Sequence, residues 1–218
     1  MKDKLQFYSK SADKLPGVGA GEYIENIADY IPLSKITNWR HMLSNFYVSP
    51  FMVDGHKWNS MEHFYHACKF RNPSTYDYYL TFTYDGGEPW SRADGPTAWA
   101  AGQAGKQNSK GIVTDRKVLG KKLPKDVIMI NNFFDIKDTI MTIGFFAKFS
   151  QNPLLKDMLL KTNNSDLVHY VSSRRSNVTN ELWNNLMKVR ECIRKYDDKY
   201  DLSFYSNFSV EEVNEMLA

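Results

Sequence analysis

Apolar residues recur mainly at helical spacing along this chain. Between residues 135 and 149 they return at every third or fourth position, which predicts an amphipathic helix. The same spacing predicts helices over about residues 60–70 and 179–196. Further helices are expected over 97–106, after Pro73 to cover Tyr76–Leu80, after Pro153, and from Ser209, where Ser209 and Glu212 match a capping box.

Strand signals are few and short. Asp54-Gly55 separates two apolar runs that end near Val53 and begin at His56, which is typical of a hairpin with a type I′ turn. Leu167–Val171 reads as a second strand region, and the lysine-rich residues 107–132 as a long surface connection. The fold class is therefore α+β, mainly helical with a few short strands. We expect an extension over 1–40, a catalytic domain over 41–197 and a C-terminal helix over 198–218.

A glycine-rich segment, Pro16-Gly-Val-Gly-Ala-Gly21, lies within the expected N-terminal extension. Its glycines do not fit the spacing of a dinucleotide-binding fingerprint, and no clear strand precedes them. A flexible turn is favoured over a phosphate-cradling loop.

Charge and cysteine content restrict the function classes. The formal net charge of the 218 residues is +3, too small to favour nucleic-acid binding through a general positive field. Cys68 and Cys192 are widely separated, which suggests free thiols in a reducing compartment. The N-terminus has no apolar signal-peptide core, and no run approaches the length of a membrane span. We expect an intracellular protein, cytoplasmic or nuclear.

The helix predicted over residues 60–70 carries two stripes of side chains. Glu62, His66 and Lys69 follow one another at i, i+4 and i+7, beside the apolar stripe. Glu62 and Lys69 would lie about 10 Å apart along the helix axis, so a ligand could fit between a carboxylate and a cation. The apolar stripe consists of Met61, Phe64, Tyr65 and Cys68.

Each of these polar residues also has a purely structural interpretation. With Asn59 as N-cap, Glu62 would occupy the N3 position of a capping box. Lys69 would ordinarily be a solvated helix lysine, and Trp58 a core residue. His63 and His66 are three residues apart without a third ligand, so no metal site is expected.

The segment 43–70 resembles the NADAR (YbiA-like) family. The pattern S-N-F, V-D-G-x-x-W-x-S-x-E-H-x-x-x-A-x-K-F is matched nearly throughout, and looser matches follow in order to about residue 195. The matching residues are Ser44-Asn45-Phe46, Val53-Asp54-Gly55, Trp58, Ser60, Glu62-His63, Ala67 and Lys69-Phe70, then Ala101-Gly102 with Lys106, Ala147-Lys148-Phe149, Leu159-Leu160, Leu167-Val168 and Leu186-Met187 with Arg190. Phe7-Tyr8-Ser9-Lys10 resembles a longer subgroup of the family.

The resemblance implies hydrolysis of an N-glycosidic bond in a ribosyl compound, without a cofactor or a metal. By position, Glu62 becomes the catalytic carboxylate, and Lys69 becomes a phosphate ligand or a Schiff-base partner of an opened ribose. The remaining matched positions imply substrate-binding roles. These residues are Ser44, Asn45, Phe46, Trp58, His63, Gly102 and Lys106.

Two departures from the family pattern bear on the substrate. Phe133 stands where some members have tryptophan, and Ser172–Asn180 replaces a glycine-rich Asp-x-x-Trp-Gly stretch. These differences disfavour phosphoribosyl intermediates of riboflavin synthesis and favour removal of ADP-ribose from guanine in nucleic acid or nucleotides. Arg174 and Arg175 would add contacts to an anion.

Other function classes remain open at this stage. The same pocket would serve a non-catalytic module that binds NAD or ADP-ribose. A third alternative is a nucleic-acid adaptor or repair factor in which a basic connection tracks a strand, against the simpler interpretation of a solvated loop. The cations of this connection are Lys106, Lys110, Arg116, Lys117, Lys121, Lys122 and Lys125.

Overall fold

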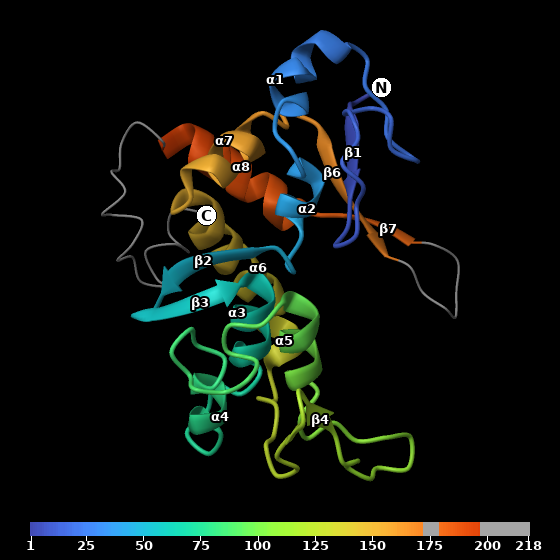
Figure 1. The fold of residues 1–218 in the computed structure, drawn as a ribbon. Helices are drawn as coiled ribbons and strands as arrows, with labels where there is room; N and C mark the ends of the chain where they lie inside the picture. Colours follow the sequence, from blue (N-terminus) through green and yellow to red (C-terminus); the bar gives the residue numbers. More distant parts are fainter. Residues whose placement is uncertain (172–178, 197–218) are drawn as a thin grey trace.

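The computed structural model describes residues 1–171 and 179–196, and it is an α+β fold dominated by helices, as predicted (Figure 1). Its helices are η1 (Ile27–Tyr30), α1 (Ile31–Ser34), α2 (Trp39–Leu43), α3 (Met61–Cys68), α4 (Tyr76–Leu80), α5 (Gly95–Ala101), α6 (Phe133–Ser150), α7 (Pro153–Leu160) and α8 (Asn184–Tyr196). Its strands are β1 (Lys4–Phe7), β2 (Val48–Val53), β3 (His56–Ser60), β4 (Lys117–Val118), β5 (Lys121–Lys122), β6 (Asp166–Val171) and β7 (Thr179–Leu182).

The N-terminal segment contributes a strand to the main sheet. The strand order is β1-β6-β7, with β1 parallel to β6 and β7 antiparallel to it. Leu5, Phe7 and Leu167 of this sheet are completely buried. Because β1 is paired with β6 along its length, the sheet spans the expected boundary at residue 40.

The β2–β3 hairpin has the predicted turn. Asp54 and Gly55 both adopt positive φ, of 52° and 71°, as a type I′ turn requires. This turn matches the right-handed twist of the flanking strands. Phe51, Val53 and Trp58 consequently face the interior, where they are at most 2 % exposed.

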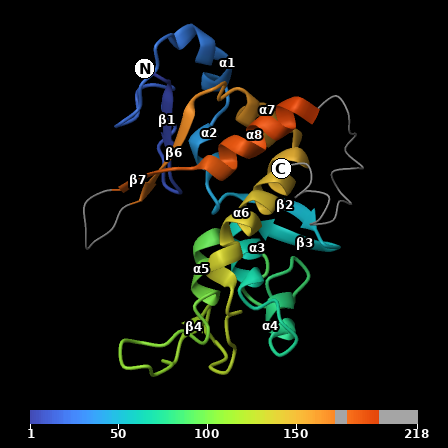
Figure 2. The same cartoon turned by 180° about the vertical axis from the view of Figure 1, so that it is seen from behind.

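Helix α6 is the centre of the molecule. It contacts α3, α7, α8 and β2, and in Figure 2 it lies in front of the β2–β3 hairpin. Gly144 allows the close approach to α3, since a Cβ atom there would lie 2.5 Å from the Sδ atom of Met61. Phe145, Phe146 and Phe149 of the same helix are almost fully buried. Burial of apolar area around α6 therefore contributes to the stability of the fold.

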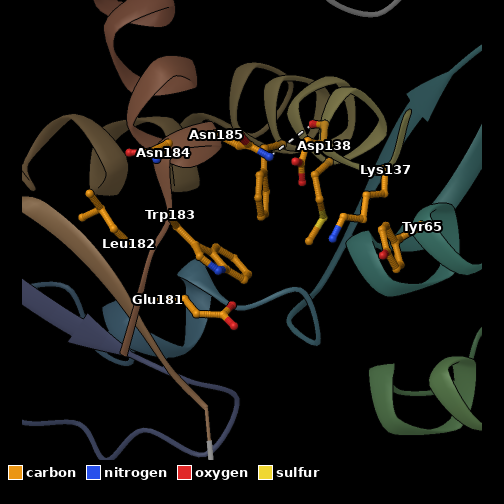
Figure 3. A pocket seen from close by; sticks show the side chains of 10 residues that line it. Tyr65, Lys137, Asp138, Glu181, Leu182, Trp183, Asn184 and Asn185 are labelled. Atoms are coloured by element: carbon orange, nitrogen blue, oxygen red, sulfur yellow. Dashed lines mark hydrogen bonds between the residues drawn. The ribbon is translucent and has the colours of Figure 1, made fainter. Parts of the chain in front are cut away.

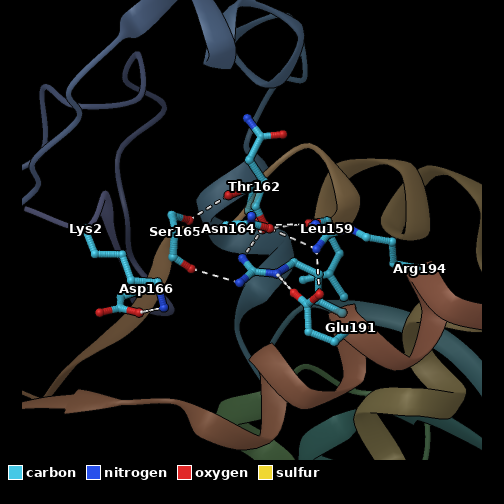
Figure 4. A network of polar contacts seen from close by, with 10 residues as sticks. Lys2, Leu159, Thr162, Asn164, Ser165, Asp166, Glu191 and Arg194 are labelled. Atoms are coloured by element: carbon cyan, nitrogen blue, oxygen red, sulfur yellow. Dashed lines mark hydrogen bonds and ion pairs between the residues drawn. The ribbon is translucent and has the colours of Figure 1, made fainter.

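A polar network fastens α8 to the turn between α7 and β6 (Figure 4). The buried guanidinium of Arg190 donates to Thr162 Oγ1 at 2.8 Å and to the carbonyl oxygen of Ser165 at 2.9 Å. Glu191 pairs with both Arg190 and Arg194 at the surface end. These partners satisfy a cation that burial alone would destabilise.

Three predictions of secondary structure need correction. The helix expected over 179–196 begins only at Asn184, because residues 179–182 pair with β6 as strand β7. Pro73 does not start a helix, since Asn72 caps a local turn and α4 begins at Tyr76. The helix expected over 97–106 ends at Ala101.

Two further expectations concern connections and the C-terminus. The connection over residues 107–132 contains a short hairpin, β4–β5. The helix expected from Ser209, together with the segment 198–218, lies outside the described residues. No helix within 1–171 or 179–196 is long and apolar enough to cross a membrane.

The glycine-rich segment binds a carboxylate of its own chain. The backbone N–H groups of Gly17 and Gly19 donate to Glu22 Oε2 at 3.0 and 2.9 Å. The same carboxylate forms a buried ion pair with Arg40 at 2.7 Å. The segment is thus a turn whose N–H groups are occupied by Glu22, which leaves no support for a phosphate-cradling role.

Candidate functional site

The polar stripe of α3 is almost entirely buried. Glu62 is 6 % exposed and His66 is 2 % exposed. His66 Nε2 lies 2.8 Å from Glu62 Oε1, one helical turn away. Because an ionised carboxylate can only accept, Nε2 carries the hydrogen of this bond. The second oxygen of Glu62 has no hydrogen-bond partner in the described part of the chain.

The capping-box interpretation of Glu62 is wrong. Ser60 is the N-cap of α3, so Glu62 occupies the second helical position rather than the third. The side chain of Asn59 donates instead to the carbonyl oxygen of Ala93, at 2.9 Å. The position in the first turn still exposes Glu62 to the positive end of the helix dipole, which favours negative charge there.

Gly102 holds the opposite side of His66. A Cβ atom at Gly102 would lie 2.0 Å from His66 Nδ1, so only glycine fits at this contact between α3 and the end of α5. His66 Nδ1 is buried without a partner in the described residues. Burial lowers the pKa of His66, against the opposing effect of Glu62. A neutral ring with its hydrogen on Nε2 therefore suits this position.

Four of the residues singled out by the sequence meet in one cavity. Ser44, Asn45, Phe46 and Glu62 line a hollow of about 650 Å³ between the main sheet and the start of α3. The backbone N–H of Glu62 donates to the carbonyl oxygen of Asn45 at 3.2 Å, which ties the two segments together. The remaining lining residues are Tyr8, Ser9, Lys10, His169, Tyr170 and Trp183.

A buried lysine supports the wall of this cavity. Lys148 on α6 has no exposed surface, and its Nζ atom donates to the carbonyl oxygens of Met42 and Ser44 at 2.7 and 2.8 Å. The ring of Phe149 lies 4.9 Å from the same Nζ atom. Burial lowers the pKa of Lys148 to about 7. Lys148 thus fixes the backbone just before Asn45.

Lys69 lies at the far end of α3 from Glu62. Its Nζ atom is 5.7 Å from the ring centres of Tyr65 and Phe133, and the side chain is partly buried. Burial lowers the pKa of Lys69 to about 8; Glu62 opposes this shift and Lys106 adds to it. Lys106 is exposed and donates to Gln103 Oε1 at 3.2 Å. The α3 stripe therefore runs from the carboxylate of Glu62 to Lys69, which has Lys106 as a neighbouring cation.

Two residues expected in the pocket belong to the core. Trp58 is completely buried, with its ring against Phe64 and Tyr79 at 5.5 and 5.4 Å, so it is not a wall of the cavity. His63 is also fully buried, because Ser60 Oγ and the carbonyl oxygen of Trp90 bind its two nitrogens at 2.7 and 2.9 Å. Burial lowers its pKa to about 4. Neither side chain is available to a substrate.

Reasoning from the sequence missed the contribution of the main sheet. Trp183, after β7, stacks on His169 of β6 with ring centres 4.5 Å apart. Tyr8 follows β1, and the only sequence signal for it is the resemblance of residues 7–10 to a subgroup of the family. Arg174 and Arg175, expected as anion contacts, lie outside the described residues.

A second cavity, of about 540 Å³, shares Trp183 with the first (Figure 3). Figure 3 shows Glu181, Trp183, Lys137 and Tyr65 around this space. Tyr65 follows Glu62 by three residues on α3, so the two cavities flank the same helix.

These features define a small α+β domain with a carboxylate-bearing pocket, and sequence comparison identifies the class. The NADAR domain family matches residues 34–194, so the chain belongs to this family. In structure the chain is similar to the E. coli protein YbiA, solved by NMR, with a TM-score of 0.52 and 18 % identity over 92 % of this chain and 91 % of that one. That likeness concerns the fold alone. Comparison with curated protein sequences gives no match.

Proposed function

We propose that this protein is an N-glycosidase that removes ADP-ribose from guanine bases. The observation that carries the proposal is Glu62, a carboxylate that is 6 % exposed, lines a cavity and has one oxygen held by His66. The other oxygen is free to act on a substrate. A carboxylate buried beside aromatic side chains is the arrangement that cleavage of a ribosyl–base bond requires.

Cleavage of an N-glycosidic bond develops positive charge at the anomeric carbon and the ring oxygen of the ribose. A carboxylate placed next to that carbon stabilises the charge, most effectively where water is largely excluded. Glu62 would then accept a proton from the attacking water, whose oxygen bonds to the anomeric carbon. The base leaves with the electrons of the broken bond, and the proton that Glu62 took from the water passes by way of solvent to the base nitrogen, which restores the carboxylate. The hydrogen bond from His66 keeps the carboxylate oriented throughout.

Aromatic residues of the cavity suit a flat base. Phe46, Tyr8 and Trp183 line the same hollow as Glu62. Stacking of a base on an aromatic ring contributes about 1–3 kcal/mol. Asn45 Oδ1 is buried without a hydrogen-bond partner among the described residues, so it is available to a donor on the substrate. This combination favours a nucleobase over a simple sugar.

Lys69 supplies positive charge at the other end of α3. With a pKa of about 8, its amine is mostly protonated at neutral pH and suited to a phosphate group. The same lowered pKa would also suit a Schiff base with an opened ribose, the other role that the family resemblance implies. Lys106 adds a second cation nearby.

The test is hydrolysis of an ADP-ribosylated guanine oligonucleotide, scored as free ADP-ribose. We expect release by the wild type and a loss of at least about 100-fold with Glu62→Gln. The amide oxygen can still accept from His66, so the variant should melt close to the wild type. Glu25→Gln, which neutralises an exposed glutamate, is the matched control. If neither wild type nor variant releases ADP-ribose while both bind it, the chain is a binding module and the proposal is wrong.

A further inference from the structure

The connection between α5 and α6 carries an unusual concentration of positive charge. Residues 106–125, here called the basic arm, contain seven lysines and arginines and one acid, Asp115. The whole chain has a net charge of only +3, so the rest of the molecule is net negative. The cations of the arm are exposed. The field of this protein is therefore strongly asymmetric and centred on one segment.

Both ends of the basic arm are fastened next to Lys69. Lys106, at its start, is close enough to Lys69 to help lower the pKa of that residue. Beyond its end, the N–H of Ile130 donates to the carbonyl oxygen of Lys69 at 2.8 Å. At its neck, a Cβ atom at Gly105 would lie 2.0 Å from the carbonyl oxygen of Val127. The arm thus projects from the cationic end of the α3 stripe, as Figure 1 shows below α5.

The hairpin of the arm places like charges opposite each other. Lys117 on β4 is the cross-strand partner of Lys122 on β5. Such pairs destabilise a hairpin, unless an anion lies between or beside them. Lys121 and Lys125 pair with Glu88 and Asp115. In contrast, Lys117 and Lys122 form no ion pair within the described part of the chain, although both lie close enough to Asp115 to help lower its pKa. One carboxylate shared with Lys125 does not balance the two, so positive charge is left for a partner.

We propose that the basic arm binds the sugar–phosphate backbone of a single-stranded nucleic acid whose modified base enters the Glu62 cavity. This inference rests on the proposed function. Glu62 is 6 % exposed at this cavity, so a base reaches the carboxylate only after leaving its stack, and a single strand delivers such a base at the lowest cost. A row of lysines on an exposed hairpin provides the non-specific phosphate contacts that such a strand requires. The arm extends the cationic end of the α3 stripe, so one strand could contact the arm and also reach the Glu62 cavity.

The binding test uses an unmodified, fluorescently labelled single-stranded oligonucleotide of about ten nucleotides and the full chain. Affinity is measured by anisotropy between about 50 and 300 mM salt. We expect log K to fall linearly with log salt, and the double variant Lys117→Gln/Lys122→Gln to lower the slope by up to about 1.4, since each phosphate contact contributes about 0.7. Lys35→Gln/Lys188→Gln removes the same charge from exposed positions on other elements and should leave the slope unchanged.

The double variant removes both the repulsion between the two lysines and their attraction to Asp115, so its melting temperature should stay close to that of the wild type, which separates lost binding from lost folding. With an ADP-ribosylated oligonucleotide, KM should rise in the double variant while kcat stays constant. With an ADP-ribosylated guanosine mononucleotide, neither value should change.

Three outcomes would overturn the inference: a wild-type slope near zero, a double variant with an unchanged slope, or salt-dependent binding only to phosphatidylserine vesicles. The oligonucleotide is unmodified, so its binding does not depend on turnover. Loss of ADP-ribose release with the binding slope intact would refute only the proposed reaction.

Discussion

Replacing Lys148 with methionine would test how the cavity wall is held. The substitution removes the donor that serves the carbonyl oxygens of Met42 and Ser44 while keeping most of the apolar stem. Each carbonyl left unpaired should cost about 1–3 kcal/mol. The buried charge of Lys148 itself destabilises the folded state, because it has no anionic partner. Burial accordingly lowers the pKa of Lys148 to about 7. The unfolded chain has the ordinary lysine pKa of about 10.4.

The sign of the pH dependence follows from these two pKa values. Between about pH 7 and pH 10 the unfolded state binds more protons than the folded state, so the wild type gains stability as the pH rises. At about 1.4 kcal/mol per pKa unit, Lys148 contributes a gain of about 3 kcal/mol between pH 6 and pH 9. The methionine variant lacks this gain. The difference in unfolding free energy between the wild type and the variant should therefore grow by that amount between pH 6 and pH 9.

Urea unfolding of both proteins at about pH 6, 7, 8 and 9 measures this difference. Groups that titrate in both proteins, Lys69 included, cancel in the comparison. Curves of unfolding free energy against pH that run parallel would show that Lys148 keeps an ordinary pKa, and would refute the reasoning.

The other predictions concern the site more directly. Gly102→Ala should displace His66, because the added Cβ would lie 2.0 Å from its Nδ1 atom. A shift of the site by about 1 Å should lower kcat about 100-fold. An unchanged kcat would show that His66 does not orient Glu62. If Lys69 binds phosphate as a cation, kcat/KM should fall as the pH rises through about 8, whereas an increase over that range would favour the Schiff base. Trp58→Phe should lower the free energy of unfolding by about 1–3 kcal/mol and leave KM unchanged, because Trp58 is completely buried; a raised KM in a stable variant would return Trp58 to the pocket.

Local patterns of the sequence predicted much of the fold. The turn at Asp54-Gly55 depends on backbone conformations that these two residues readily adopt, so the hairpin could be recognised from a few positions. Helices α3, α6 and α7 each bury apolar residues that repeat at helical spacing, so these helices could also be recognised from the sequence. Strand β7 could not be recognised, since its pairing with β6 depends on a partner distant in sequence.

The stripe of Glu62, His66 and Lys69 could also be predicted from the sequence, because helical spacing alone places these residues along one side of α3. Spacing could not show which neighbours of that stripe reach the cavity. Trp58 and His63 lie within a few residues of Glu62, yet packing directs both into the core.

The sequence by itself determined the family, the helix that carries the carboxylate, and the charge of the basic arm, because each depends on residues close together in the chain. Only the tertiary structure decided that β6 and the residues just after β1 and β7 supply six of the ten residues that line the cavity, that Gly102 abuts His66, and that Lys148 holds the backbone at Ser44. These contacts join segments that are distant in sequence, and they arise from the packing of α3, α5, α6 and the main sheet rather than from any local preference.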